Sequence, residues 1–335
     1  MEYRYLGGSA LKVSPLCLGA MMFGGETDEL TSKRIIDKAF EAGINFVDTA
    51  DVYHEGRSEE IVGRSIAYHR DRWVVATKFG YPNAQAGPNE QGQSRKWIIQ
   101  SVDASLKRLG TDYIDILYFH RALTSAPLTE AVRAIGDLIR QGKVRYFGVS
   151  NFRGWRIAEI VRLADQLGID RPIASEPLYN IVDRSAEAEQ LPAAAHFGLG
   201  VVSYSPLARG VLSGKYAVDG LPPPDSRAGR GDKRIHQTEW RPESLRIAQA
   251  IAIHAAERGT TSIAFAIAWV LKNRMVSSTI TGPRTEAQWD SYLDALQLKL
   301  GPEDEKLIDI LVPPGHASTL GYTDPVYPIE GRLVT

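Results

Sequence analysis

The sequence contains very little cysteine: Cys17 is the one cysteine among 335 residues. This excludes an intramolecular disulfide and any zinc site built on several cysteines. The seven histidines show no H-x-H or H-E-x-x-H spacing, so we expect no metal ion. Because Cys17 lies in the apolar stretch LCLGAMM, we interpret it as a buried thiol in a reducing, intracellular setting.

Long apolar runs and an excess of charge are also missing. The longest apolar stretch, residues 263–271, is too short to span a bilayer, and the first ten residues lack a secretion-signal pattern. The formal net charge of −1 favours neither nucleic acid nor acidic lipid as a partner. We therefore expect a cytoplasmic protein that binds neither nucleic acid nor membrane, and the sequence does not decide its oligomeric state.

Two common nucleotide-binding motifs are absent as well. Neither G-x-G-x-x-G after a strand nor the Walker pattern occurs: GAMMFGG has the wrong glycine spacing, and GRGD follows no expected strand. A nucleotide cofactor would therefore have to lie across a surface built in another way.

What the chain does contain is a regular alternation of short apolar runs and longer amphipathic segments, at about thirty residues per pair. Eight such pairs with right-handed crossovers predict a (β/α)8 barrel, in one domain spanning residues 1–335. A doubly wound open sheet is the alternative. The expected strands are 16–22, 44–50, 73–80, 113–120, 144–151, 173–180, 200–206 and 276–282, and the expected helices are 29–43, 58–69, 94–110, 128–142, 153–168, 188–198, 262–273 and 285–296.

Three segments depart from this repeat. Residues 3–16 alternate around a Gly-Gly turn, which predicts a β-hairpin closing the floor of the barrel. Residues 208–242, after the seventh strand, are rich in Gly, Pro and Arg and indicate a long loop, which at that length is functional or disordered. The tail, residues 313–335, has no periodicity, and we expect it to pack on the surface.

Polar residues follow the apolar runs at the positions where a (β/α)8 barrel builds its active site. Each one alone is compatible with a structural role, such as capping a turn or bordering the core. Together they indicate one site on the barrel rim. They are Asp48, Lys78, His120, Ser150 with Asn151, Glu176, and Ser205 after Tyr204.

The chemistry that fits this rim is proton donation to a carbonyl. Tyr53 follows Asp48 by five positions, and a tyrosine with an ordinary pKa of about 10 needs a nearby cation to act near neutral pH. Lys78 can supply that charge, Asp48 can hold the lysine in place, and His120 can donate to the substrate oxygen. Because none of these groups carries a hydride, a cofactor must supply the electrons.

The last third of the chain offers cations for such a cofactor. Arg209, Lys215, Arg227 and Arg230 lie in the long loop, and Arg284 opens the last helix at GPRTEAQ, where a helix N-terminus would attract phosphate. The alternative is a merely solvated basic loop.

At this point the sequence resembles the aldo-keto reductase superfamily over nearly its whole length. The matching motifs are GINFVDTADVY, VATKFG, SLKRLGTDYIDILYFHR, IRQGKVRYFGVSNF, YSPLARGVLSGKY and TGPRTEAQ, in the family's order. The long loop is similar to the branch that holds potassium-channel β-subunits and bacterial sugar-ketone reductases. The resemblance implies a (β/α)8 barrel that uses NADPH to reduce aldehydes or ketones, including sugar-type carbonyls, reversibly to alcohols.

The resemblance also implies roles for single residues. Asp48, Tyr53, Lys78 and His120 match the catalytic tetrad, with Tyr53 the proton donor. Ser150 and Asn151 match positions that hold the nicotinamide carboxamide, and Tyr204 matches the aromatic residue that stacks on the nicotinamide ring. Positions lining the pyrophosphate, ribose phosphate and adenosine match Ser205, Leu207, Lys215, Arg227, Gly282, Arg284 and Gln288.

Three positions depart from the family pattern. Glu176 replaces the usual glutamine and can donate to an amide only when protonated. Ser291 and Tyr292 stand where a Glu-Asn pair is usual near the adenine, and Ala20 stands where many relatives have threonine or serine. We expect Met21, Phe23 and His54 to contact the substrate, with core packing as the alternative for the first two.

Two other functions compete with a reductase. One is an NADPH-binding regulatory or sensor subunit with slow turnover, as in channel β-subunits, in which asparagine replaces the histidine that is present here as His120. The other is a lyase with Lys78 as a Schiff-base nucleophile, which a neighbouring Asp48 would oppose by keeping the lysine charged.

Overall fold

The computed structural model describes residues 1–82, 86–123 and 126–329, so the last six residues of the expected tail lie outside it. The chain divides into two compact units. The barrel unit comprises Met1–Pro177, Glu189–Tyr204 and Arg274–Asp290, and the helical unit comprises Leu178–Ala188, Ser205–Asn273 and Ser291–Thr335. That both units form one domain stays a prediction.

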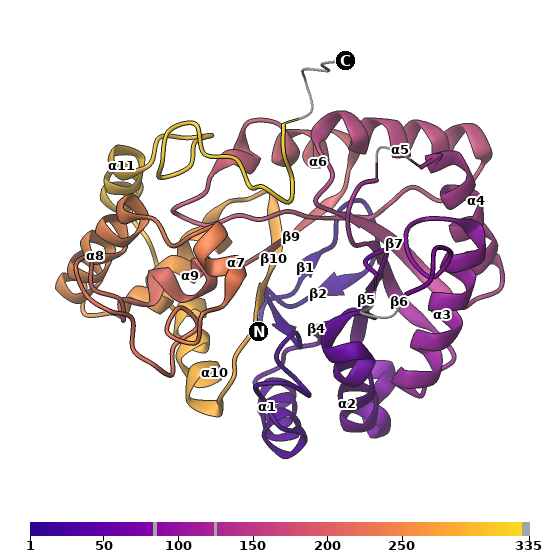
Figure 1. The fold of residues 1–335 in the computed structure, drawn as a ribbon, viewed down its shortest axis with the longest axis horizontal. Helices are drawn as coiled ribbons and strands as arrows, with labels where there is room; N and C mark the ends of the chain where they lie inside the picture. Colours follow the sequence, from indigo (N-terminus) through magenta and orange to yellow (C-terminus); the bar gives the residue numbers. More distant parts are fainter. Residues whose placement is uncertain (83–85, 124–125, 330–335) are drawn as a thin grey trace. The chain divides into compact units, whose positions relative to one another are not determined.

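All eight strands of a closed parallel barrel belong to the barrel unit, in the order β10-β3-β4-β5-β6-β7-β8-β9 (Figure 1). Each expected apolar run contains one of them, which confirms the predicted (β/α)8 barrel and excludes the doubly wound sheet. The strands are β3 Leu16–Gly19, β4 Phe46–Asp48, β5 Val74–Phe79, β6 Ile114–Phe119, β7 Val144–Ser150, β8 Ala174–Glu176, β9 Gly200–Tyr204 and β10 Val276–Thr281.

The six helices that lie wholly in the barrel unit also match their predicted positions, and Figure 1 shows them outside the strands. Local capping sets their ends: Asp28 and Ser94 accept the free N–H groups of the first and third helix, and Gly110, Gly168 and Gly198 end helices in the left-handed conformation. The helices are α1 Glu29–Glu41, α2 Arg57–Ile66, α3 Arg95–Leu109, α4 Leu128–Arg140, α5 Gly154–Leu167 and α6 Gln190–Phe197.

The contact between α2 and the end of α3 requires a glycine. A Cβ added at Gly63 would lie 2.2 Å from the carbonyl oxygen of Leu109, which is backbone and cannot rotate away. We expect Gly63→Ala to lower the free energy of unfolding by about 1–3 kcal/mol, as overpacking does. Urea unfolding measures this loss.

Gly136→Ala in α4 is the matched control for this prediction. The added Cβ would meet the Cδ1 atom of Ile169 at 2.8 Å, and a side-chain end can move, while alanine favours the helix by about 1 kcal/mol over glycine. If both variants lose the same free energy of unfolding, the contact between α2 and α3 does not require a glycine at position 63.

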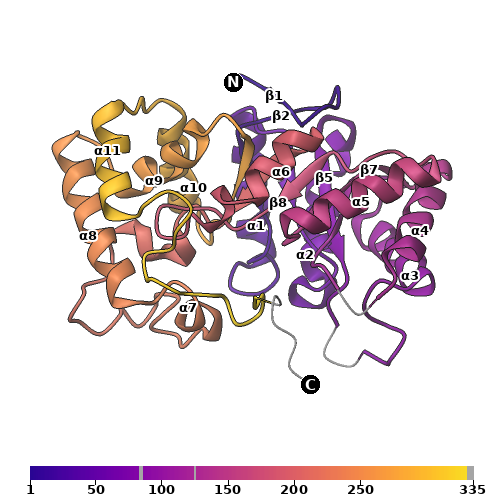
Figure 2. The same cartoon turned by 90° about the horizontal axis from the view of Figure 1, so that it is seen from above.

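The predicted N-terminal hairpin is present, and it covers the amino ends of the barrel strands (Figure 2). Strands β1 Arg4–Tyr5 and β2 Lys12–Val13 pair antiparallel, and the Gly8 amide donates to the Gly198 carbonyl at 2.8 Å, just before β9. Leu6 and Val13 are fully buried and pack with the interior residues of the barrel. This confirms that the hairpin closes the barrel floor.

The helical unit is more ordered than the sequence predicted. The expected loop 208–242 contains a short 3-10 helix and the five-residue α7, Lys233–Gln237. We did not predict α8 Pro242–Glu257 or α11 Pro302–Leu311, whereas α9 Ser262–Lys272 and α10 Glu286–Leu293 lie where helices were expected. The tail packs within this unit, where Thr319 donates to Glu243 of α8 at 3.0 Å.

No helix in the described part of the chain is both long enough and apolar enough to cross a membrane.

Candidate active site

The polar residues that the sequence places at strand ends do meet at the carboxyl end of the barrel. Asp48, Ser150 and Glu176 are the last residues of β4, β7 and β8, Lys78 is the second-to-last residue of β5, and His120 directly follows β6. Parallel strands in register bring these ends to one rim, and Ser150 pairs directly with Glu176.

The ammonium group of Lys78 is the centre of the site. Its side chain is fully buried and forms an ion pair with Asp48 Oδ1. It also donates to the Thr49 carbonyl at 3.0 Å, and it lies 5.4 Å from the centre of the Tyr53 ring. Glu176 Oε1 lies 3.6 Å from the same nitrogen. The predicted contact between the tyrosine and its cation is therefore present.

Two carboxyl groups thus share one buried ammonium group. Burial raises the pKa of both, but Lys78 forms its closer contact with Asp48, and the pKa of Glu176 is raised further, well above its usual range. We infer that Glu176 holds a proton near neutral pH. Burial lowers the pKa of Lys78, but the negative charge of Asp48, with which it forms an ion pair, offsets this and keeps the ammonium protonated.

A proton on Glu176 makes stability depend on pH. The unfolded chain releases this proton near its ordinary pKa of about 4.3, whereas the folded protein keeps it, so stability falls as pH rises above that value. Glu176→Gln removes the group. We expect its melting temperature to match the wild type in mild acid and to exceed it increasingly toward alkaline pH.

Thermal unfolding across this pH range, with Glu41→Gln at the exposed end of α1 as the control, measures the difference. A difference between Glu176→Gln and the wild type that stays constant with pH would mean that Glu176 is ionised in the folded protein.

An unusual backbone turn presents Tyr53 to the lysine. The tyrosine opens a short 3-10 helix, Tyr53–Gly56, in which His54 and Glu55 both adopt left-handed φ angles, of 48° and 58°. This conformation costs on the order of 1–2 kcal/mol per non-glycine residue. The His54 ring packs against Gly25, where an added Cβ would lie 1.8 Å from Cε1. Packing therefore holds the turn in a strained conformation.

The electrostatic environment of Tyr53 differs in one respect from the expectation. Burial raises the pKa of Tyr53, and the opposing charge of Lys78 does not offset this rise. The hydroxyl is therefore fully protonated through neutral pH. It remains an effective acid toward an alkoxide, which is a stronger base than a phenolate.

The imidazole of His120 lies between two tyrosine rings. Its centroid is 5.8 Å from that of Tyr53 and 4.7 Å from that of Tyr81, both edge to face. Burial, and then the charges of Lys78 and Arg121, lower the pKa of His120 well below its usual range. A neutral imidazole donates from one nitrogen only, and Nδ1 is buried without a hydrogen-bond partner among the described residues.

A second polar cluster adjoins the first. Ser150 Oγ donates to the Glu176 carbonyl at 3.1 Å and lies 3.4 Å from Glu176 Oε1. Asn151, with a left-handed φ of 59°, donates to the His120 carbonyl at 3.2 Å and accepts from the Tyr204 hydroxyl at 2.8 Å. Tyr204 is thus tied to the rim through Asn151. Glu176 Oε2 is buried, and we find no partner for it in residues 1–82, 86–123 and 126–329.

The predicted substrate contacts differ in exposure. Met21 is 37% exposed, whereas Phe23 is fully buried and serves the core. His54 is partly exposed and lies 3.5 Å from Glu26. Their contact with a substrate stays a prediction.

Three predicted cofactor residues follow β10 in the barrel unit. Gly282 is exposed, and the Arg284 amide donates to Gln288 Oε1 at 2.7 Å. The Arg284 carbonyl accepts from Thr27 at 3.1 Å. These bonds organise the predicted phosphate segment and leave Gly282 accessible.

The other four predicted cofactor residues lie in the helical unit. Ser205 has a left-handed φ of 56°, and its carbonyl accepts from Asn180 at 3.1 Å. Leu207 is partly exposed, and Lys215 is exposed with its ammonium 5.1 Å from the centre of the Tyr216 ring. The fourth of these residues, Arg227, forms an ion pair with Asp232.

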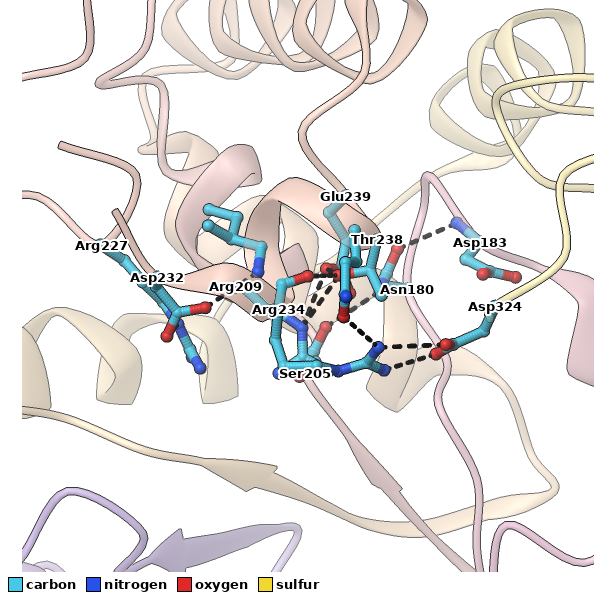
Figure 3. A network of polar contacts seen from close by, with 12 residues as sticks. Asn180, Asp183, Ser205, Arg209, Arg227, Asp232, Arg234, Thr238, Glu239 and Asp324 are labelled. Atoms are coloured by element: carbon cyan, nitrogen blue, oxygen red, sulfur yellow. Dashed lines mark hydrogen bonds and ion pairs between the residues drawn. The ribbon is translucent and has the colours of Figure 1, made fainter. Parts of the chain in front are cut away.

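Three arginines of the helical unit, Arg209, Arg227 and Arg234, are paired with carboxylates (Figure 3). Arg227 Nε lies 2.8 Å from Asp232, and Arg209 Nε lies 2.9 Å from the buried Glu239. A separate ion pair of 2.7 Å joins Arg234 of α7 to Asp324 of the tail. The basic loop is therefore not simply solvated, and a phosphate at Arg227 would have to compete with Asp232.

Two rim residues escaped the sequence analysis, Tyr81 and Arg121. Tyr81 stands three positions after Lys78, and Arg121 directly follows His120. Their position just beyond strand ends could have identified them. Within the described residues, we find no cluster of three histidine, cysteine, aspartate or glutamate side chains able to hold a metal ion.

A parallel barrel with polar groups gathered at the carboxyl ends of its strands has the architecture in which (β/α)8 enzymes carry their active sites. The chain belongs to the aldo/keto reductase family, whose sequence pattern matches residues 15–313. This confirms the resemblance.

Relatives of two kinds are similar over most of their length. The chain is 38% identical to the "Probable voltage-gated potassium channel subunit beta" of Oryza sativa subsp. japonica, over 93% of this chain and 97% of the relative. It is 37% identical to the "Uncharacterized oxidoreductase YrpG" of Bacillus subtilis (strain 168), over 96% and 99%. The chain is also 39% identical to a "Probable voltage-gated potassium channel subunit beta" of Arabidopsis thaliana, over 89% of this chain and 92% of the relative.

Proposed function

We propose that the protein is a cytoplasmic NADPH-dependent oxidoreductase that reversibly reduces an aldehyde or ketone, including sugar-type carbonyls, to an alcohol. The observation that carries this proposal is the placement of Tyr53 beside both the buried ammonium of Lys78, which Asp48 holds, and the imidazole of His120. This set can protonate a carbonyl oxygen at neutral pH.

The four side chains divide the work of proton transfer. His120 donates a hydrogen bond to the carbonyl oxygen and positions it near the Tyr53 hydroxyl. Tyr53 then gives its proton to that oxygen as negative charge develops. The Lys78 ammonium stabilises the phenolate that remains, and Asp48 keeps the ammonium in place. In the reverse direction, the phenolate takes the proton from the alcohol.

NADPH would supply the hydride, and the rim offers groups that fit it. Glu176 Oε2 is a buried polar atom without a partner among the described residues, and its protonated carboxyl group can both donate and accept, as the glutamine usual at this position does. We propose that it meets the carboxamide with Ser150 and Asn151, while Tyr204 stacks on the ring. Further cofactor contacts would come from Ser205, Leu207, Lys215, Arg227, Gly282, Arg284 and Gln288. The cations among them favour NADPH over NADH.

A regulatory or sensor subunit that binds NADPH and turns over slowly is the second candidate, because two relatives carry the printed name of channel β subunits. The presence of His120 favours the enzyme. A Schiff-base lyase is disfavoured because the ion pair with Asp48 keeps Lys78 charged and therefore not nucleophilic.

The test is consumption of NADPH and of NADH by the purified protein with a panel of aldehydes, sugar ketones and quinones, together with fluorescence titration of each cofactor. Turnover with NADPH supports the enzyme. Tight cofactor binding without turnover of any panel member would favour the regulatory subunit, and tighter binding of NADH than of NADPH would reverse the proposed cofactor preference.

A further inference from the structure

The guanidinium group of Arg121 stands at the rim without a countercharge among the residues that the structure describes. Its carbon lies 4.5 Å from the centre of the Tyr81 ring. Its Nε is buried, and in the described part of the chain this nitrogen has no hydrogen-bond partner and the guanidinium forms no ion pair. A partly buried cation without an anion is costly, and stacking on a tyrosine compensates only in part.

Arg121 is also placed beside the reacting groups. It follows His120 directly, and the Tyr81 ring on which it stacks packs edge to face against the imidazole, at 4.7 Å. The backbone is held as well, since Gln93 Nε2 donates to the Arg121 carbonyl at 2.6 Å. Two successive ring contacts thus connect the guanidinium to the group that would hold the substrate oxygen.

We propose that Arg121 binds an anionic group of the substrate, so that the preferred substrates are small aldehydes or ketones with a carboxylate or phosphate a few bonds from the carbonyl. The planar fork of an arginine suits both anions, because each accepts two parallel hydrogen bonds. The substrate anion supplies the countercharge, and the Tyr81 ring holds the guanidinium in place beside His120. This inference rests on the proposed function.

The test compares charged and uncharged substrates of similar size. Succinic semialdehyde is paired with butanal, and glyceraldehyde 3-phosphate with glyceraldehyde. For the wild type we expect a higher kcat/KM for the charged member of at least one pair. The pair with the larger ratio of charged to uncharged kcat/KM shows whether the site prefers a carboxylate or a phosphate. In Arg121→Met we expect this preference to fall about 10- to 100-fold, mainly through KM, because hydrogen bonds between charged groups are lost.

Arg145→Met is the matched control. Arg145 also stacks on a tyrosine, 4.7 Å from the centre of Tyr113, but it lies near the amino end of β7, away from the rim. Its loss should leave the preference unchanged. Arg121→Lys keeps the positive charge but lacks the planar guanidinium, so it should retain part of the preference for charged substrates.

Two outcomes separate this inference from the proposed function. If the wild type reduces both members of each pair equally, or Arg121→Met keeps the preference, the anion site is wrong and the reductase stands. If no substrate is reduced, the reductase is wrong, and calorimetric titration with succinate and with inorganic phosphate still tests the site. Binding to the wild type that is lost in Arg121→Met supports the site, and equal or absent binding overturns it.

Discussion

Replacing Tyr53 by phenylalanine should lower kcat for carbonyl reduction by about 10²- to 10⁴-fold, the usual contribution of a general acid. Phenylalanine keeps the ring that lies 5.4 Å from the Lys78 ammonium but removes the proton that our mechanism transfers to the substrate oxygen. NADPH binding, followed by fluorescence, should survive because the hydroxyl has no proposed contact with the cofactor.

Tyr118→Phe provides a matched control. The Tyr118 ring lies 6.0 Å from the same lysine nitrogen, its hydroxyl is buried, and we find no hydrogen-bond partner for that hydroxyl among the described residues. It is part of the barrel interior and has no role in the mechanism, so kcat should stay close to the wild type. A Tyr53→Phe variant that keeps most of its kcat would place the acid elsewhere, and His120 would then be tested next.

Lys78→Met should destabilise the folded protein by about 3–5 kcal/mol at neutral pH, the usual cost of leaving a buried charge without its partner. Methionine has a similar length, so the main loss is electrostatic: the Asp48 carboxylate remains in the barrel interior without its cation. Urea unfolding measures the change directly, and it does not depend on any assumption about the reaction.

The pH dependence and a second substitution separate this cause from simple misfolding. Without the cation, the carboxyl groups bind protons more readily in the folded state, so the deficit should shrink as pH is lowered toward their ordinary range. The double variant Lys78→Met with Asp48→Asn removes the stranded charge and should recover much of the loss. If Lys78→Met alone is as stable as the wild type, the ion pair contributes nothing to the fold.

Some features of the helical unit could not be predicted from local patterns. The segment that forms α8, PESLRIAQAIAIHAAE, is dominated by small apolar residues, and we predicted no helix there, whereas the continuous apolar run of α9 was recognised. The ion pair between Arg234 and Asp324 joins residues far apart in the chain. Such pairings depend on how helices and tail fold together and have no local signature.

The sequence by itself determined the barrel and the members of its rim. Each strand lies in a short apolar run, and in most of these runs a polar residue stands at or beside the strand end. This pattern depends only on burial along the strand, so Asp48, Lys78, His120 and Glu176 could be recognised without coordinates.

Only the tertiary structure decided how close the charged groups of the rim lie to one another and which further side chains contact them. Closure of the barrel brings Glu176 of β8 within 3.6 Å of Lys78 of β5, and burial, with the nearby charge of Asp48, raises the pKa of Glu176 well above its usual range. Likewise, the stacking of Arg121 on Tyr81 leaves a cation without a partner among the described residues beside His120. A pKa and an unpaired charge depend on distances between strands, which no linear pattern contains.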